Sequence, residues 1–253
     1  MPPRPPPTHF LCIPLVTGTS RHQLSASLGS FKADVTSPDS FGVPEQAIRP
    51  VGTIHLTLGV MSFPKNEGLE DAVSLLKTLI PRQILASATT TSMGECAPEP
   101  TQQSAKATEP TGPSPPLLSV TLRGLHSMQL ASQSSVLYAS PVDQDGTLLK
   151  FCESVRSTFQ EAGLMTEENR PLLLHATIMN TIYVKGRDRR GGGHGKKKKE
   201  KLTLDARGII DRYDDFVWME DVPVEKIAIC KMGAKKQEDG DEAYEVEAEI
   251  DFV

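Results

Sequence analysis

The chain has 253 residues, a formal net charge of -5 and 38% hydrophobic residues. This composition suits one large domain or two small lobes with a real core, and the mild acidity excludes a protein whose whole surface binds nucleic acid. The four scattered cysteines form no C-x-x-C pair, which predicts neither a disulfide framework nor a zinc cluster and favours a reducing compartment.

Membrane insertion and secretion are not expected. No apolar run approaches the length of about 18 residues that a membrane-spanning helix needs. Residues 1–7 are proline-rich and lack the apolar centre of a signal peptide, and we expect them to be disordered. The pattern predicts a soluble protein of the nucleus or cytoplasm.

The first third of the chain predicts a strand, a helix, a strand and a second helix. Residues 8–16 are a short apolar run typical of a strand, and leucine and phenylalanine recur at helical spacing over residues 20–31. Prolines break residues 36–50 into a loop before a strand at roughly 53–60. A second amphipathic helix, which Pro81 is expected to end, is indicated by Leu69, Ala72, Val73, Leu76 and Ile80.

The composition changes at residues 87–116. This segment is rich in Ser, Thr, Ala, Gln, Glu and Pro and has almost no large apolar residue. It buries too little surface to offset the entropy of ordering it. We therefore expect a disordered insertion, either a solvated linker or a segment regulated by phosphorylation.

The rest of the chain predicts two strands, a helix and three further strands. The first two strands are expected at residues 117–125 and 136–139, and the last three at 172–183, 222–230 and 244–252. The helix is marked by apolar residues that step by four and three, namely Leu148, Cys152, Val155, Phe159 and Ala162. The order of elements indicates an α+β fold built twice, with residues 8–253 as a single domain of two lobes.

Two of the expected strands carry the same short motif. Residues 54–58 and 174–178 both read apolar-His-apolar-Thr-apolar. Because side chains alternate between the two faces of a strand, His55 shares a face with Thr57, and His175 shares a face with Thr177. Two imidazoles that titrate near neutrality predict a general acid and a general base, and the hydroxyls of the threonines suit phosphoryl oxygens.

The paired motifs resemble the signature of the two-histidine (2H) phosphoesterases, which include the LigT-type RNA ligases and cyclic phosphodiesterases. The narrower resemblance is to the phosphoesterase domain shared by the small subunit of the activating signal cointegrator complex and the gamma-type A-kinase anchoring protein. It covers about residues 8–253 apart from the insertion. Besides the two motifs, residues 8–11, 59, 179–181 and 249–252 carry it. The cointegrator subunit carries a KH domain ahead of this one, and no GXXG loop precedes the first strand here.

This resemblance implies a bilobal fold in which two antiparallel sheets face each other across a cleft, with one motif on each. It implies a phosphodiesterase that acts on a 2′,3′-cyclic phosphate or a 2′,5′-linkage at an RNA end or in a short oligonucleotide. His55 and His175 are then catalytic, Thr57 and Thr177 bind the phosphoryl group, and neither a metal nor another cofactor is needed. Just past the second motif, Asn180, Thr181 and Tyr183 are candidates to line the cleft.

Other readings stay open. The histidines could be satisfied core residues, or the domain could bind RNA or nucleotides without catalysis in a nuclear transcription or repair complex, or it could ligate RNA by the reverse reaction. Zinc is disfavoured because neither motif brings a Cys, Asp or Glu at ligand spacing. Neither a G-x-S-x-G elbow nor a phosphate-binding G-x-x-x-x-G-K-[ST] loop is present.

A basic, glycine-rich loop is expected at residues 185–201. Its most compact part is the run Lys196, Lys197, Lys198 and Lys199. Three interpretations fit this run: a solvated loop, a nuclear localisation signal, or a guide for RNA phosphates toward the second motif.

Overall fold

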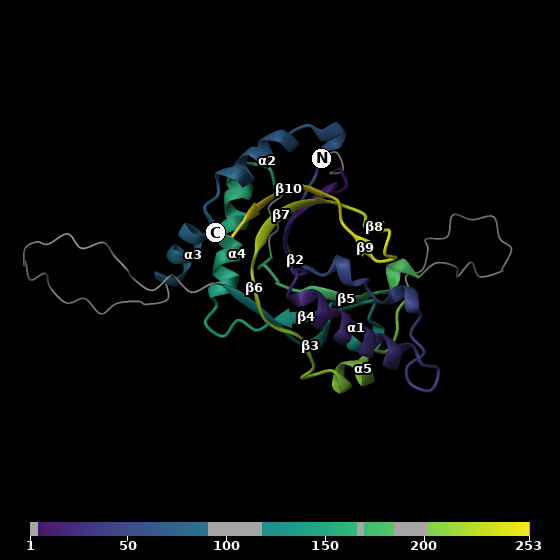
Figure 1. Ribbon diagram of the computed structural model, residues 1–253. Coiled ribbons are helices and arrows are strands. Elements are labelled where there is room, and N and C mark those ends of the chain that lie inside the picture. Colours follow the sequence, from purple (N-terminus) through teal and green to yellow (C-terminus); the bar gives the residue numbers. More distant parts are fainter. Residues whose placement is uncertain (1–4, 91–117, 166–169, 185–201, 253) are drawn as a thin grey trace, which may run out of the picture.

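The computed structural model describes residues 5–90, 118–165, 170–184 and 202–252. These residues form an α+β fold with two four-stranded antiparallel sheets and flanking helices (Figure 1). The fold class predicted from the sequence is confirmed. The insertion from residue 91 onward, the loop at 185–201 and the lysine run within it lie outside the described residues.

Each motif strand lies at the edge of its sheet. The first sheet has the order β10-β7-β1-β2 and the second has the order β5-β4-β3-β6. The strands of the first sheet are β1 (His9–Pro14), β2 (His55–Met61), β7 (Lys226–Lys231) and β10 (Val246–Asp251). Those of the second sheet are β3 (Ser119–Ser127), β4 (Val136–Pro141), β5 (Ala176–Asn180) and β6 (Val217–Pro223). A short hairpin pairs β8 (Lys235–Lys236) with β9 (Glu242–Ala243).

Two helices connect the two sheets, because each packs on the sheet to which its preceding strand does not belong. Helix α1 follows a strand of the first sheet but packs on β6 of the second, and α4 follows a strand of the second sheet but packs on β2 of the first. Helix α2 packs on β10, and α3 packs on α4. The helices are α1 (Ser20–Thr36), α2 (Leu69–Thr78), α3 (Pro81–Thr90), α4 (Thr147–Glu161) and α5 (Arg207–Arg212).

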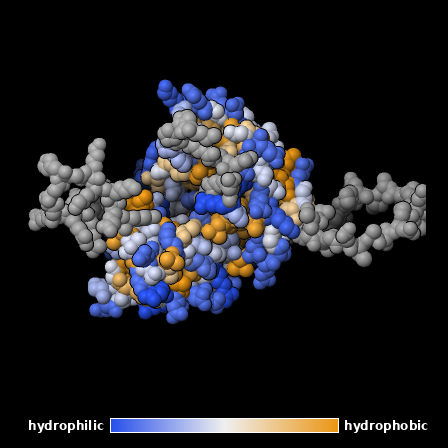
Figure 2. Space-filling view, turned by 180° about the vertical axis from the view of Figure 1, so that it is seen from behind, coloured by the Kyte–Doolittle hydropathy of each residue, from blue (hydrophilic) through white to orange (hydrophobic). Residues whose placement is uncertain are grey.

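One continuous apolar core joins the two lobes, because α1 and α4 each pack on the sheet of the other lobe. It contains Leu56 and Leu58 from the first motif strand and Ala176 and Ile178 from the second, all almost fully buried. The alternation predicted for the two strands therefore holds on their apolar faces. On the face shown in Figure 2, hydrophobic residues are interspersed among hydrophilic ones.

Two predicted boundaries near residue 80 are wrong. Pro81 does not end a helix: α2 ends at Thr78, and Pro81 is the first residue of α3. Proline suits a first helical position because the N–H it lacks would have no helical partner there. Helix α3 continues to Thr90, so the start of the expected disordered insertion at residue 87 falls inside a helix.

The predicted strand at residues 222–230 is also wrong, because it is two strands in different sheets. Strand β6 ends at Pro223 in the second sheet, and β7 begins at Lys226 in the first. A proline has no N–H with which to extend a ladder, which suits the end of a strand. The chain crosses between the lobes at this point.

Candidate functional site

The two H-x-T-x motifs meet because the edges of the two sheets meet. Strand β2 ends the first sheet, β5 ends the second, and the two strands contact each other. His55 is the first residue of β2, and His175 directly precedes β5. Both histidines and both motif threonines are half-buried, so each keeps some contact with solvent.

The His55 ring is held in one tautomer by the backbone. Its Nδ1 atom lies 2.7 Å from the carbonyl oxygen of Thr53, and a carbonyl oxygen only accepts. Nδ1 therefore carries the hydrogen, and in the neutral ring Nε2 is the acceptor. Nε2 lies 3.0 Å from Oγ1 of Thr57, whose hydroxyl donates to it. The ring thus points its basic nitrogen toward the side of the strand that holds the threonine.

The His175 ring repeats the first half of this arrangement. Its Nδ1 atom donates to the carbonyl oxygen of Leu173 at 2.8 Å, again two residues earlier in the chain. The second nitrogen, Nε2, is again left as the acceptor of the neutral ring. Unlike Thr57, Thr177 makes no side-chain hydrogen bond within the described part of the chain. Its hydroxyl is free to bind a ligand.

Burial holds both imidazoles neutral at neutral pH. The pKa of His55 is lowered to about 4, mainly because the protein around the ring excludes water. The bond to Thr53 raises it, whereas the charge of Arg49 and, when that ring is protonated, the charge of His175 lower it further. The pKa of His175 is also lowered by desolvation and by Arg170, while its bond to Leu173 acts in the opposite direction. The action of His175 on His55 shows that the two rings are near each other.

Aromatic rings pack against each histidine. Phe10 in β1 lies 4.8 Å from the His55 ring between centroids, and Tyr244 lies 5.2 Å from it, edge to face. On the other side Tyr138, paired with Thr177 across β4 and β5, lies 5.5 Å from the His175 ring. These contacts orient the imidazoles. None of these three aromatic residues could be assigned to the site from the sequence, because strand register is needed to place them beside a histidine.

Arg49 is a further residue that the sequence analysis missed. It lies in the loop before β2, and its backbone N–H donates to the carbonyl oxygen of Ile178 in β5 at 2.9 Å. Its side chain is buried, with 6% of the residue exposed. The guanidinium carbon lies 4.1 Å from the ring centre of Tyr183, and Nη2 donates to the hydroxyl of Tyr244 at 3.3 Å.

The three residues predicted to line the cleft have different roles. Thr181 is 3% exposed and its hydroxyl donates to the carbonyl oxygen of Leu202, so its assignment to the cleft is wrong. The side-chain oxygen of Asn180 accepts from the N–H of Ile182 and caps a short turn. Tyr183 is 43% exposed and stacks on Arg49, which places it beside the motifs.

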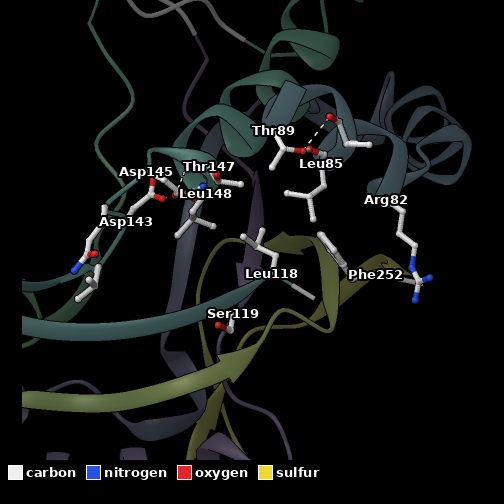
Figure 3. Close-up of a pocket in the computed structure, with 13 residues that line it drawn as sticks. Arg82, Leu85, Thr89, Leu118, Ser119, Asp143, Asp145, Thr147, Leu148 and Phe252 are labelled. Carbon is white, nitrogen blue, oxygen red and sulfur yellow. Dashed lines mark hydrogen bonds between the residues drawn. The ribbon is translucent and has the colours of Figure 1, made fainter. Parts of the chain in front are cut away.

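A separate cavity of about 480 Å³ contains no residue of either motif (Figure 3). Its walls come from α3, the start of β3, the turn before α4 and the C-terminal end of the chain. The labelled side chains include Leu85, Leu118, Leu148 and Phe252, with Arg82 at one end (Figure 3). None of its described lining residues is a histidine, so this cavity offers no imidazole for acid–base chemistry.

The described residues form neither a metal-binding cluster nor a membrane-spanning helix. No group of three or more His, Cys, Asp or Glu is placed there to hold a metal ion. Of the described helices, none is both long and apolar enough to cross a membrane.

Two antiparallel sheets that each bring one H-x-T-x motif to the edge where the sheets meet define a domain of the 2'5' RNA ligase-like class. The chain belongs to the family of AKAP7 2'5' RNA ligase-like domains, whose model matches residues 7–252. This match covers both motif strands and the strands between and after them.

Three known proteins are similar to this chain. An uncharacterized protein of Schizosaccharomyces pombe, C15D4.13c, is 31% identical over 121 residues, which cover 48% of this chain and 51% of that protein. The alignment thus spans about half the length of this curated relative. TT0787 of Thermus thermophilus is 15% identical, with 97% of each chain covered and a TM-score of 0.49. LigT of E. coli, solved in complex with 3'-AMP, is 14% identical, with 98% of this chain and 99% of that chain covered and a TM-score of 0.46.

Proposed function

We propose that the protein is a phosphodiesterase that acts on an RNA end or a short oligonucleotide, with a 2′,3′-cyclic phosphate or a 2′,5′-linkage as the reacting group. The single observation that carries this proposal is the matched geometry of the imidazoles. Each Nδ1 is tied to a carbonyl oxygen two residues earlier, which leaves each Nε2 to exchange a proton with a ligand. Two such nitrogens on neighbouring strands suit general acid–base catalysis.

We assign different roles to the two histidines. His55 has the strongly lowered pKa and stays neutral, so we assign it as the general base that takes a proton from water. His175 is the general acid. In hydrolysis of a cyclic phosphate, the water oxygen bonds to phosphorus while its proton passes to Nε2 of His55. The bond from phosphorus to one ribose oxygen then breaks, and Nε2–H of His175 protonates that oxygen.

Binding of substrate lets His175 take up from solvent the proton that it needs as an acid. The free protein keeps both rings neutral, because burial disfavours the imidazolium form. An anionic phosphodiester beside the rings favours that form and raises both pKa values. The hydroxyls of Thr57 and Thr177 donate to the non-bridging oxygens as negative charge grows on them. These proton transfers need no metal ion.

The test is turnover of a 2′,3′-cyclic nucleotide and a 2′,5′-linked dinucleotide by the parent, His55→Ala, His175→Ala and the double variant, with and without EDTA. Each single change should lower kcat by roughly 10²–10⁴, and the double change by much less than the product of the two. His22→Ala, an exposed histidine on α1, is the matched control and should retain full activity. Full activity in His55→Ala or His175→Ala, or loss of the parent's activity in EDTA, would contradict the acid–base pair.

A second candidate function is nucleotide or RNA binding without catalysis, within a nuclear complex. The lowered pKa of both rings favours it, because the free site lacks the imidazolium form that an acid catalyst requires. RNA ligation is a third candidate, since it uses the same proton transfers in reverse. A parent that binds nucleotides but cleaves no phosphodiester in the panel supports the binding function, and joining of a 2′,3′-cyclic end to a 5′-hydroxyl end supports ligation.

A further inference from the structure

A buried arginine lies where the two lobes meet. Arg49 is tied by its backbone to β5, while its side chain lies between Tyr183, just after β5, and Tyr244, just before β10. Tyr244 in turn packs edge to face on the His55 ring. The guanidinium group is therefore held by residues that adjoin strands of both sheets, and only the Tyr244 ring separates it from the His55 ring.

The positive charge of Arg49 is not neutralised within the described part of the protein. Its side chain makes one hydrogen bond there, to the neutral hydroxyl of Tyr244, and no carboxylate forms an ion pair with it. Four other arginine side chains differ from it, because each pairs with an aspartate: Arg21, Arg123, Arg207 and Arg212. A guanidinium has five N–H donors, so most donors of Arg49 are without a protein acceptor.

These donors are not completely enclosed by the described part of the protein. None of the nitrogens of Arg49 is among the atoms that are both fully buried and unpaired. The 6% of the residue that remains exposed thus includes nitrogen atoms that a ligand can reach. Burying a cation without an anion costs folding free energy. A site that keeps such a cation beside two catalytic-type histidines has the charge to receive an anion.

We propose that Arg49 is a substrate-contacting residue whose guanidinium binds the non-bridging oxygens of the reacting phosphoryl group. Tyr183 and Tyr244 hold the planar group at the junction of the two motif strands. Because the negative charge on phosphorus rises during attack, this contact strengthens toward the transition state. The inference rests on the proposed function for the identity of the ligand, but it concerns binding and is measurable without turnover.

The electrostatics of the first histidine agree with this position. The charge of Arg49 acts on His55 and lowers its pKa, which requires the guanidinium to be near that ring. A cation there would also favour an anionic ligand over its neutral analogue. The contact therefore predicts discrimination between a nucleotide and the matching nucleoside.

The experiment is calorimetric titration of 3'-AMP and of uncharged adenosine into the parent, Arg49→Met, Arg49→Lys and the control Arg207→Met. Arg207 is exposed and paired with Asp205, so its variant makes the same change in net charge away from the motifs. We expect Arg49→Met to weaken 3'-AMP binding by about 10- to 100-fold, as for loss of a charge-assisted hydrogen bond, and to leave adenosine binding unchanged. The affinity of Arg49→Lys for 3'-AMP should lie between those of the parent and Arg49→Met. Arg207→Met should bind 3'-AMP as tightly as the parent.

A thermal melt separates ligand binding from a structural role. Arg49→Met removes an uncompensated buried cation, so its Tm should equal or exceed that of the parent. A lower Tm with equal losses for 3'-AMP and adenosine would overturn the proposal, as would unchanged 3'-AMP affinity in Arg49→Met. If the parent binds 3'-AMP through Arg49 but cleaves no substrate, the role of Arg49 stands and the catalytic function fails.

Discussion

The Nε2 atom of His55 lies 3.0 Å from the hydroxyl oxygen of Thr57, whereas the hydroxyl of Thr177 has no hydrogen bond within the described residues. The two motifs match in sequence but differ in this contact. Thr57 therefore interacts with the imidazole before any substrate arrives, and a phosphoryl group must compete for its hydroxyl. The difference allows the two threonines to be separated by experiment.

Replacing the threonines should have unequal effects on His55. Thr57→Val and Thr177→Val should each lower kcat by about 10-fold, less than loss of either histidine, because one hydrogen bond to the phosphoryl group is removed. Thr57→Val should also raise the pKa of His55, because the hydroxyl that donates to the neutral ring is gone. Titration of the imidazole resonances by NMR measures this shift. Thr57→Ser and Thr177→Ser keep the hydroxyl and serve as controls, and a His55 shift in Thr177→Val would contradict the assignment.

The lowered pKa of His55 makes stability depend on pH in a defined window. Between pH 6.5 and about 4 the unfolded chain protonates this histidine while the folded chain does not, so stability falls as the pH falls. Over that window the parent should lose up to roughly 3 kcal/mol more unfolding free energy than His55→Gln. Urea unfolding at several pH values measures the difference. Parallel curves for the two proteins would show that the ring is not held neutral by burial.

Gly52 is expected to be intolerant of a side chain. A Cβ atom there would lie 2.5 Å from the backbone oxygen of Glu242 and 3.0 Å from the carboxylate of Asp241, which accepts from the Gly52 N–H. Gly52→Ala should cost about 1–3 kcal/mol of stability. It should also lower activity, because the adjacent Thr53 carbonyl orients His55. Gly29→Ala, on α1 with open space around it, should instead stabilise by about 0.5–1 kcal/mol; equal melting temperatures would contradict both expectations.

The composition of the insertion predicts that most of it is dispensable. Replacing residues 92–116 with a short Gly/Ser linker should change the unfolding free energy by less than about 1 kcal/mol, because surface loops tolerate changes in length. Replacing 87–116 should cost about 1–3 kcal/mol, since it removes the last turn of α3 with the buried Ala88. Chemical denaturation compares the two. A large loss in the shorter deletion would mean that the segment packs against the domain.

The lysine run at residues 196–199 stays a prediction of nuclear targeting. A fluorescent fusion in which all four lysines are changed to Ala should lose nuclear accumulation relative to the parent. Changing Lys32, Lys65, Lys77 and Lys236, which are exposed and dispersed over the domain, provides the comparison for a loss of four charges alone. An unchanged nuclear fraction in the four-lysine variant would instead favour a solvated or phosphate-contacting loop.

The sequence by itself determined the features that depend on local periodicity. Alternation with period two placed Leu56 and Leu58 in the core and put His55 and Thr57 on the other face, because neighbouring side chains of a strand point in opposite directions. The same reasoning predicted most helices and the α+β class. The catalytic roles of the two histidines remain a prediction that no measurement has yet tested.

Only the tertiary structure decided how distant segments combine. The proximity of β2 to β5, the division of residues 217–231 between two sheets and the exchange of α1 and α4 all depend on pairings between strands far apart in the chain. The burial of Arg49 depends on Tyr183 and Tyr244, which no local pattern links to it. Such contacts are selected by packing and hydrogen bonding across the whole domain, whereas periodicity reports only which face of one element is apolar.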